Sequence, residues 1–520
     1  MPAKERRKHH KTFDRRRARY HGLFRAFSVI MVLLFQVLFI LGLTYWLREY
    51  SVKIYLAIQI LSSFIVFALV SNNEYNQKFW IAIIVALPGF GFILYFFWGS
   101  TRKNFAVNER LRDSEEEMKG KLPENEEELE ILSAIHPNKI QISRYLARDG
   151  FPVYKNTSMK YYPVGDELEG DFLEDLKNAK KSIFMEYFII YNGEWWKEIE
   201  EILIQKAAEG VDVRVLIDDF GSLYMDPIEM KKNLGSNNIK VGSYEPIGKR
   251  ITSLSFNYRN HQKICVIDST IGYTGGINIA DEYLNKIVRF GHWLDTAIRL
   301  EGRAVMSLSA TFLTMWEQVV KEDCSEIDIE PEWDGRDEGY VQPFAGGPHR
   351  APHNPVEGAY SRMINKARDY IYITTPYLVL DERMVNDLVS AALSGVDVRI
   401  ITPRIYDKWA VYMVTVKNYG RLLKDGVKIY EYVPGFIHEK DAVSDDECAI
   451  CGTINLDYRS MYIHHENGVF VADSHIVTDI KENILKTIER SEEISYEKWK
   501  KRPIGQKIIQ NALYILSPLF

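Results

Sequence analysis

The octapeptide at residues 261–268 carries the residue types needed for chemistry at phosphorus. It reads His261-Gln262-Lys263-Ile264-Cys265-Val266-Ile267-Asp268, an HxKxxxxD pattern. The run is apolar and β-branched, which indicates a buried strand. Side chains two positions apart on a strand point the same way, so His261 and Lys263 share one face. An imidazole beside a fixed cation can attack a phosphorus atom while the cation holds its oxygens.

The same pattern occurs a second time in the chain. His438, Lys440 and Asp445 repeat the spacing of the first motif. A glycine follows each histidine by 14 positions (275 − 261 and 452 − 438), and an asparagine follows each by 17 (278 − 261 and 455 − 438). These coincidences predict a duplicated unit. The paired residues are Gly275 with Gly452, and Asn278 with Asn455.

Two equivalent histidine–lysine strands predict one shared phosphodiester site. If the halves pack about a pseudo-two-fold axis, one imidazole attacks phosphorus and forms a phosphohistidine. The other protonates the leaving alkoxide and then deprotonates the incoming alcohol. Lys263 and Lys440 would neutralise the phosphoryl oxygens, and Asn278 and Asn455 would donate hydrogen bonds to them.

An attacking imidazole needs its other ring nitrogen held, ideally by a carboxylate. Two acidic residues that follow the motif strands, Asp295 and Glu466, are the candidates. Asp268 and Asp445 lie at an odd offset from their histidines, so on a continuous strand they would point away from the pocket. We interpret these two motif aspartates as structural residues that fix the turns towards the paired glycines.

A metal site is the competing interpretation. The chain has 12 histidines, and the neighbours His464 and His465 are potential ligands. A lysine two positions after each motif histidine disfavours a bound cation, so the pattern favours metal-independent chemistry. Cys448 and Cys451 form a CxxC pair, but a second pair is missing from the four cysteines. We interpret them as core residues of a reduced, cytosol-facing domain.

The first hundred residues favour a membrane. The chain has 520 residues and a net charge of −6, which gives no overall basic field for nucleic acid, yet residues 4–19 are strongly basic. Three apolar runs follow, at residues 27–46, 54–70 and 79–98, with aromatic residues near their ends. The first and third are long enough to span a hydrocarbon layer of roughly 30 Å. Basic clusters before residue 27 and after residue 98 both favour the cytoplasmic side, but three full spans would put them on opposite sides of the membrane. We therefore expect that one run is re-entrant or interfacial, or that one basic cluster lies on the other side in spite of its charge.

From about residue 150 the pattern alternates strands and helices. We expect strand 182–190, helix 195–210 and strand 211–216, repeated as strand 370–375, helix 384–395 and strand 396–401. Such alternation predicts an α/β fold with βαβ units and mostly parallel sheets. Residues 113–135 are acidic and predict a solvated helical tether. The hydrophobic tail, residues 504–520, needs a partner, either the core or a bilayer surface.

These residues resemble the phospholipase D superfamily, whose mark is the paired HxKxxxxD motif, and within it the bacterial cardiolipin synthases. The likeness covers nearly the whole chain. It is carried by Leu87-Pro88-Gly89-Phe90-Gly91, Asn257-Tyr258-Arg259-Asn260-His261, Thr274-Gly275-Gly276-Ile277-Asn278, Thr375-Pro376-Tyr377, Gly452-Thr453-Ile454-Asn455-Leu456-Asp457-Tyr458-Arg459-Ser460 and Ser517-Pro518-Leu519. Gln262, Asp441 and the additional apolar run 27–46 depart from the usual pattern.

The resemblance implies two pseudo-symmetric α-β-α halves that share one active site, preceded by a transmembrane helical region. The expected divisions are residues 1–102 (basic head and two to three transmembrane helices), 103–150 (acidic tether), 151–330 and 331–503 (the two halves) and 504–520 (tail). The catalytic residues it marks are His261, Lys263, Asp268, His438, Lys440 and Asp445, with Asn278, Asn455, Asp295 and Glu466 in support. His261 is expected to be the nucleophile and His438 the general acid.

The implied reaction converts two phosphatidylglycerols into cardiolipin and glycerol at a lipid bilayer. No nucleotide, metal or nucleic acid is expected to take part. The expected location is a multi-pass position in the cell membrane with the catalytic region facing the cytoplasm. The alternatives are a phospholipase D-type hydrolase, a synthase that uses another headgroup alcohol, a membrane-tethered nuclease and a non-catalytic scaffold. The sequence leaves open which of the two histidines is the nucleophile, the number and topology of the membrane spans, the acceptor alcohol, the oligomeric state and the role of the tail.

Overall fold

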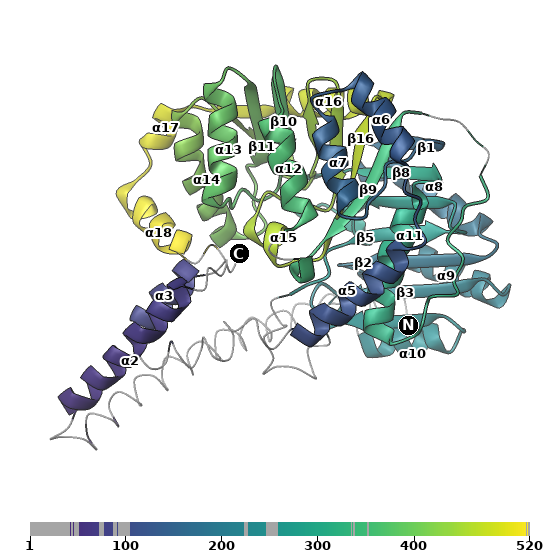
Figure 1. The fold of residues 1–520 in the computed structure, drawn as a ribbon, viewed down its shortest axis with the longest axis horizontal. Coiled ribbons are helices and arrows are strands. Elements are labelled where there is room, and N and C mark those ends of the chain that lie inside the picture. Colours follow the sequence, from purple (N-terminus) through teal and green to yellow (C-terminus); the bar gives the residue numbers. More distant parts are fainter. Residues whose placement is uncertain are drawn as a thin grey trace, which may run out of the picture. The chain divides into compact units, whose positions relative to one another are not determined.

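Two β-sheets with matching strand orders form the framework of residues 101–520 (Figure 1). The computed structural model describes residues 42, 45, 51–71, 77–86, 91, 105–222, 227–245, 258–333, 335, 338–350, 353–515 and 517. In order across the first sheet, the strands are β1 (Thr157–Tyr162), β8 (Ala297–Gly302), β6 (Ile271–Gly275), β5 (Lys263–Ile267), β2 (Ser182–Tyr187), β3 (Asp212–Asp218) and β4 (Lys240–Tyr244). In the second they are β9 (Tyr340–Gly346), β16 (Glu466–Ala472), β15 (Cys448–Gly452), β14 (Ala442–Ser444), β10 (Tyr370–Thr374), β11 (Asp397–Pro403), β12 (Lys428–Tyr432) and β17 (Ser491–Ile494). The sheets correspond strand by strand up to the additional β17, so the sequence repeat is a repeat of structure.

The prediction of mostly parallel sheets is wrong. Only β2–β3–β4 and β10–β11–β12 pair in parallel, and the other neighbours within the two sheets are antiparallel. The reason is the length of the connections. Helices join the parallel strands, whereas each motif strand turns straight back into its neighbour, which allows only an antiparallel pair.

The two motif aspartates occupy these tight turns. Asp268 and Asp445 have φ of 54° and 58°, and the residue after each is also left-handed, as in the turns that best fit the twist of a hairpin. Each carboxylate accepts hydrogen bonds from three successive backbone amides at the start of the neighbouring strand: residues 180–182 at 2.7–2.9 Å for Asp268, and residues 368–370 at 2.9–3.0 Å for Asp445. Lys139 adds an ion pair of 2.6 Å to Asp445. These aspartates therefore join the motif hairpin to the strand beside it.

The halves share a hydrophobic core between the sheets. Helix α11 (Val305–Val320) and helix α16 (His475–Glu489) lie there, and one buried cluster joins Ile298 and Leu300 of the first sheet to Val469 and Val471 of the second. The outer faces carry the remaining helices of each half. These are α8 (Gly165–Asn178), α9 (Glu194–Ala208) and α10 (Pro227–Gly235), then α12 (Pro355–Asn365), α13 (Glu382–Leu393) and α14 (Trp409–Lys424).

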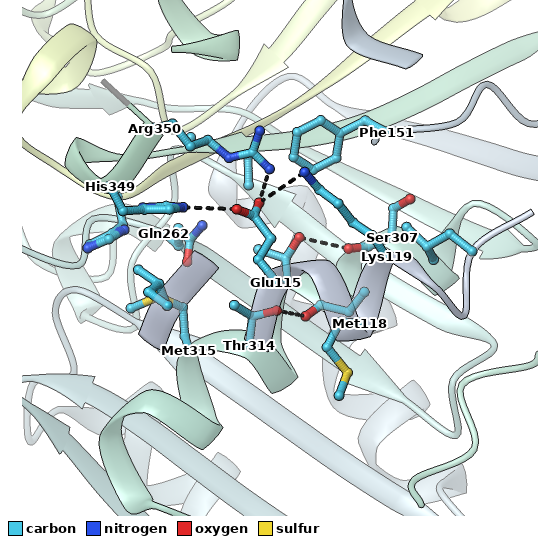
Figure 2. Close-up of a pocket in the computed structure, with 17 residues that line it drawn as sticks. Glu115, Met118, Lys119, Phe151, Gln262, Ser307, Thr314, Met315, His349 and Arg350 are labelled. Carbon is cyan, nitrogen blue, oxygen red and sulfur yellow. Dashed lines mark hydrogen bonds and ion pairs between the residues drawn. The ribbon is translucent and has the colours of Figure 1, made fainter. Parts of the chain in front are cut away.

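The segment predicted as a solvated tether packs on this body. It forms α5 (Phe105–Lys119), α6 (Glu126–Ile135) and α7 (Ile140–Arg148). Leu111 and Met118 of α5 are buried in the shared core, against α11. On the same helix Glu115 forms a hydrogen bond with His349 Nε2, at 3.1 Å, and an ion pair with Arg350 (Figure 2). The prediction of a solvated tether is therefore wrong for α5. Its acidic composition concealed a row of apolar side chains that packs on the shared core.

Residues 1–100 form a separate unit. Within it the structure describes α2 (Ser51–Ser71) and α3 (Gln77–Ala86), which contact each other. None of the helices among the described residues meets the length and apolarity needed to cross a membrane. The predicted run 27–46 lies almost entirely outside the described residues, as does most of 87–98.

Substituting the turn aspartates is expected to destabilise the fold. Asp445→Ala removes the acceptor for three amides and leaves Lys139, which is 1% exposed, as a buried charge, so we expect a loss of about 3–5 kcal/mol. Asp268→Ala should cost about 2–4 kcal/mol. Urea denaturation midpoints measure both losses. Adding Lys139→Met to Asp445→Ala should restore part of the loss, and no recovery would show that the buried charge is not the cause.

Asp445 also predicts a pH dependence. Burial opposes its ionisation, but the hydrogen bonds from Lys139 and the backbone amides outweigh burial and lower its pKa. Its contribution to stability is therefore complete above the unfolded value of about 3.9 and is lost as the pH falls through the lower folded value. The stability difference between Asp445→Ala and the parent should shrink across that range.

Candidate active site

Two backbone crossings join the motif strands of one half to the carboxylate strands of the other. Strand β13 (Gly435–Ile437) pairs in parallel with β7 (His292–Leu294), and the next amide, that of His438, donates to Leu294 O at 2.7 Å. On the other side the amide of His261 donates to His465 O at 2.9 Å. Each histidine is thus fixed by backbone from the opposite half, so the site needs both halves.

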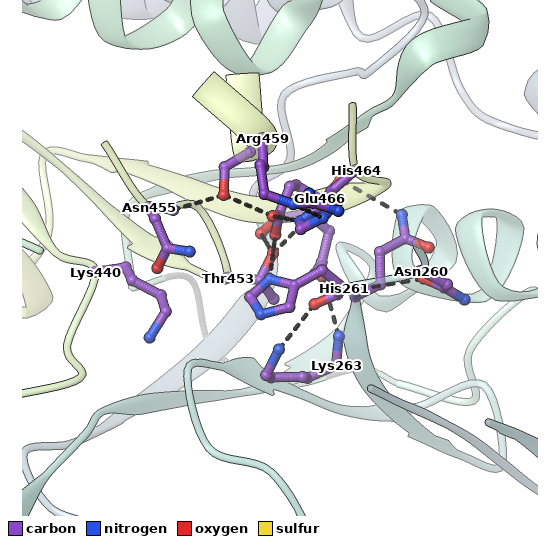
Figure 3. A network of polar contacts seen from close by, with 12 residues as sticks. Asn260, His261, Lys263, Lys440, Thr453, Asn455, Arg459, His464 and Glu466 are labelled. Carbon is purple, nitrogen blue, oxygen red and sulfur yellow. Dashed lines mark hydrogen bonds and ion pairs between the residues drawn. The ribbon is translucent and has the colours of Figure 1, made fainter. Parts of the chain in front are cut away.

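His261 lies beside a carboxylate held in place by several donors. Its Nδ1 is 2.9 Å from Glu466 Oε2 (Figure 3). Glu466 is fully buried and also accepts hydrogen bonds from Thr453 Oγ1 and, at 2.7 Å, from Ser460 Oγ. A carboxylate can only accept, so the proton of the neutral His261 ring belongs on Nδ1. This tautomer leaves the lone pair of Nε2 available for attack.

A third histidine lies next to the same carboxylate. Arg459 Nε donates to His464 Nε2 at 2.8 Å, and burial, together with the charge of Arg459, lowers the pKa of His464 well below its usual value. The neutral ring therefore carries its proton on Nδ1, which lies 3.5 Å from Glu466 Oε1. Arg459, His464, Glu466 and His261 form a continuous polar row (Figure 3).

His438 has different surroundings. Its Nδ1 lies 2.5 Å from Asp295 Oδ2 and 2.8 Å from Lys440 Nζ. Burial raises the pKa of Asp295 to about 7, against the opposing charge of Lys440. Lys440 donates when it is charged, and Asp295 donates when it is protonated. With both groups in those states Nδ1 of His438 accepts and Nε2 carries the proton, which is the opposite tautomer to that of His261.

The lysine of each histidine–lysine pair affects the pKa of both motif histidines. Burial lowers the pKa of His261 well below its usual value, and the charges of Lys263 and Lys440 lower it further. His438 responds in the same way to burial, Lys440 and Lys263. Burial also lowers the pKa of Lys263 to about 7. The pairs thus share one electrostatic environment. It keeps the histidines neutral, as a nucleophile requires, and a bound anion would favour the charged form of the lysines.

The two predicted asparagines differ in their contacts. Asn278 accepts from the Ile189 amide at 3.0 Å and donates to Tyr283 OH at 2.7 Å, so its side chain supports the protein. Asn455 lies near Lys440 (Figure 3), and its buried Oδ1 has no hydrogen-bond partner among the described residues. The Oδ1 of Asn455 is therefore available to accept a hydrogen bond from a ligand, such as a hydroxyl group.

Sequence reasoning missed most of the wall around the histidines. Rings of Trp293, Tyr283 and Phe436 lie 5.6–5.7 Å from the His438 ring, and Phe188 lies 5.0 Å from His261. Aromatic residues scattered over some 250 positions carry no signal of their own in the sequence. The wall excludes water, which strengthens the electrostatic interactions inside it.

One group of side chains near the motif histidines has the residue types of a metal site. His261, His464 and Glu466 offer ligand atoms within 4.8 Å of one another. Their hydrogen bonds do not suit a cation, because Arg459 requires the proton of His464 on the nitrogen that would bind the metal. Cys448 and Cys451 are free and buried in the core, as the interpretation of the CxxC pair predicted.

Comparison with known proteins shows the family. The model described as "Cardiolipin synthase, PLD-like domain" matches residues 172–316 and 360–488. A cardiolipin synthase of Halalkalibacterium halodurans is 32% identical over 88% of this chain and 91% of its own length. Cardiolipin synthase 2 of Bacillus anthracis is 34% identical over 85% and 86%. An uncharacterized protein of Streptococcus mutans is 38% identical over 85% and 95%.

A solved structure shows the same fold. The crystal structure of phosphatidylserine synthase from Haemophilus influenzae matches with a TM-score of 0.57 and 15% identity, covering 74% of this chain and 100% of that chain. The likeness confirms the expected two-halved α/β architecture. It extends to the fold alone.

His464 is expected to act as a positioning residue for Glu466. His464→Ala should lower kcat by about tenfold with little change in KM, because it removes the polar contact of 3.5 Å between His464 Nδ1 and Glu466 Oε1. His464→Asn keeps a donor near the Nδ1 position and should retain more activity. His465→Asn is the matched control, because the His465 side chain contacts Tyr244 OH at 3.1 Å instead. Equal losses in all three variants would contradict the assignment.

Proposed function

Because this chain belongs to the cardiolipin synthase family of phospholipase D-like proteins, we propose that it transfers a phosphatidyl group from one phosphatidylglycerol to another. The products are cardiolipin and glycerol. The observation that carries the proposal is the pair of buried imidazoles, each with its Nδ1 next to a carboxyl group of the opposite half. One ring is ready to attack phosphorus and the other to supply a proton.

We assign the nucleophile to His261. Its Nδ1–H is held by Glu466, so Nε2 is free, and the bond to Glu466 stabilises the positive charge that the ring gains on attack. We assign the general acid to His438, because its Nε2 carries a proton. The Asp295 carboxyl can transfer its own proton to Nδ1 as Nε2 gives one up. Asp295 is thus the proton store of the first step.

In the first step Nε2 of His261 forms a bond to phosphorus, and the bond from phosphorus to the glycerol oxygen breaks. The glycerol oxygen takes the Nε2 proton of His438 and leaves as glycerol. Lys263 and Lys440 stabilise the charge on the two non-bridging oxygens. The result is a phosphatidyl group on His261 and an Asp295–His438 pair short of one proton.

In the second step the pair recovers that proton from the acceptor. Nε2 of His438 takes it from the primary hydroxyl of a second phosphatidylglycerol, the resulting oxygen bonds to phosphorus, and the bond from phosphorus to His261 breaks. Cardiolipin forms and both histidines return to their starting state. The same chemistry with water would release phosphatidic acid, so the aromatic wall that excludes water favours transfer.

The substrate also places the enzyme at a membrane. We propose a multi-pass membrane position for residues 1–102, with the catalytic unit on the cytoplasmic side and its two halves at residues 151–330 and 331–503. The basic residues before position 27 and after position 98 support the orientation. Helix α2 supports a lipid environment, since it exposes the large apolar side chains Val52, Leu56, Ile60, Leu61 and Phe64.

Incubating the purified protein with phosphatidylglycerol tests the activity. We expect cardiolipin and free glycerol in equal amounts, measured by lipid mass spectrometry and an enzymatic glycerol assay. The rate should be unchanged by EDTA, because no step requires a cation. Phosphatidic acid as the sole lipid product would make the protein a hydrolase, and loss of activity that only added metal restores would contradict metal-independent chemistry.

A substrate with a better leaving group tests the two roles. Phosphatidyl-p-nitrophenol releases a phenolate that needs no proton. His438→Asn should therefore release about one equivalent of p-nitrophenol per enzyme in a rapid burst, although it is inactive on phosphatidylglycerol. His261→Asn, the matched variant, should show no burst. The opposite pattern would reverse the assignment.

A further inference from the structure

The C-terminal helix α18 (Ile504–Ile515) shows an unusual distribution of side chains. Ile504, Ile508 and Ile509 are 76%, 64% and 43% exposed. The opposite side of the helix packs on α14 and carries Gln506 and Gln510, whose amides contact a methionine sulfur of α14 at 3.9 Å. Helices normally bury their apolar face. Here isoleucines face outward and glutamines inward.

The charge around this face is strongly positive. Residues 496–515, which comprise α17 (Tyr496–Lys500) and α18, contain five basic residues and one acidic residue, in a chain whose net charge is −6. The basic residues are Lys498, Lys500, Lys501, Arg502 and Lys507, and the acidic residue is Glu497. Lys500 and Lys501 are exposed within one turn of Ile504. An apolar stripe beside lysines is typical of helices that lie in a membrane interface.

Helix α18 also ends at the rim of the active site. Leu513 and Tyr514 pack against a buried cluster that includes Val411, in the first turn of α14, and Tyr377 packs against the same cluster. The hydroxyl of Tyr377 lies 3.0 Å from Lys408 Nζ, and the charge of Lys408 acts on both motif histidines. Figure 1 shows α18 running beside α14.

The same rim carries further exposed apolar side chains. Ile405, Tyr406 and Trp409, between β11 and the start of α14, are 39%, 40% and 45% exposed. Tryptophan and tyrosine are favoured where a protein surface meets lipid headgroups. Trp409 begins α14, on which α18 packs, and these three residues with the isoleucines of α18 are called the apolar margin.

We propose that this margin docks on the surface of an anionic bilayer, with the isoleucines of α18 inserted below the headgroups and the lysines against lipid phosphates. The proposal rests on the proposed function and deepens it, because it makes α18 an element that presents the mouth of the site to its lipid substrate. Contact at this surface keeps the site next to substrate without any requirement for the lipid to leave the membrane.

Charge decides between this occupant and two others. A second copy of the chain would bring the same basic residues to the face, and like charges repel. The N-terminal head is a poor partner for the same reason, since residues 4–19 are strongly basic. An anionic bilayer matches both features of the face, because its headgroups are negatively charged and its interior is apolar.

The test uses the full-length protein with single introduced cysteines, because the four native cysteines are buried. Ile504→Cys and Ile508→Cys, labelled with an environment-sensitive fluorophore, should shift to the blue in phosphatidylglycerol vesicles and become inaccessible to an aqueous quencher. The shift should be smaller in phosphatidylcholine vesicles. Ser394→Cys, on the exposed turn after α13, is the control and should not change. This readout needs no catalysis, so it remains valid if the proposed reaction is wrong.

Kinetics provide the second measurement. Ile504→Gln with Ile508→Gln should raise the apparent KM for phosphatidylglycerol in vesicles about tenfold and leave kcat on soluble short-chain phosphatidylglycerol unchanged. Equal solvent access at positions 504, 508 and 394 in anionic vesicles would overturn the proposal. A disulfide between two copies through Ile508→Cys would assign the face to a second copy and would also overturn it.

Discussion

The contact between each motif histidine and a carboxylate from the opposite half is the interaction on which the site depends. His261 pairs with Glu466 and His438 with Asp295, and both contacts cross between the halves. Each imidazole has its carboxyl partner in the half that does not carry it. Backbone pairing between the halves, at β7–β13 and between residues 260 and 465, fixes the position of each histidine relative to its carboxyl partner. The duplicated chain therefore forms one active site.

This arrangement places several charged groups in a nearly water-free interior, which is costly unless each has partners. Lys263 and Lys440 are almost completely buried, and their ammonium groups donate to the carbonyl oxygens of their own motif histidines. The shared core formed by α11 and α16 provides the apolar packing that offsets this cost. The turn aspartates, Asp268 and Asp445, attach the motif hairpins to the same sheets. Rigid placement of unlike charges is what electrostatic catalysis requires.

The halves are similar in backbone and different in chemistry. Glu466 is surrounded by donors, and the additional histidine and arginine extend that row, whereas Asp295 shares a proton with His438 next to Lys440. A symmetric site would contain two equivalent histidines. The difference in surroundings is what gives them separate roles in the proposed reaction, and it arises from residues outside the duplicated motif.

The sequence by itself determined the duplication, the motif residues and the family, because spacing within a strand decides which side chains share a face. It also determined that Asp268 and Asp445 point away from the pocket. The tertiary structure alone decided which carboxylate serves which histidine, the docking of α5 and the antiparallel arrangement of the motif strands. It also decided which side chains of α18 are exposed. The carboxylate pairing and the docking of α5 depend on contacts between residues more than 100 positions apart, the strand directions on pairing partners in space, and the exposed face of α18 on which side of the helix is covered. None of these is encoded in the spacing of residues within one element.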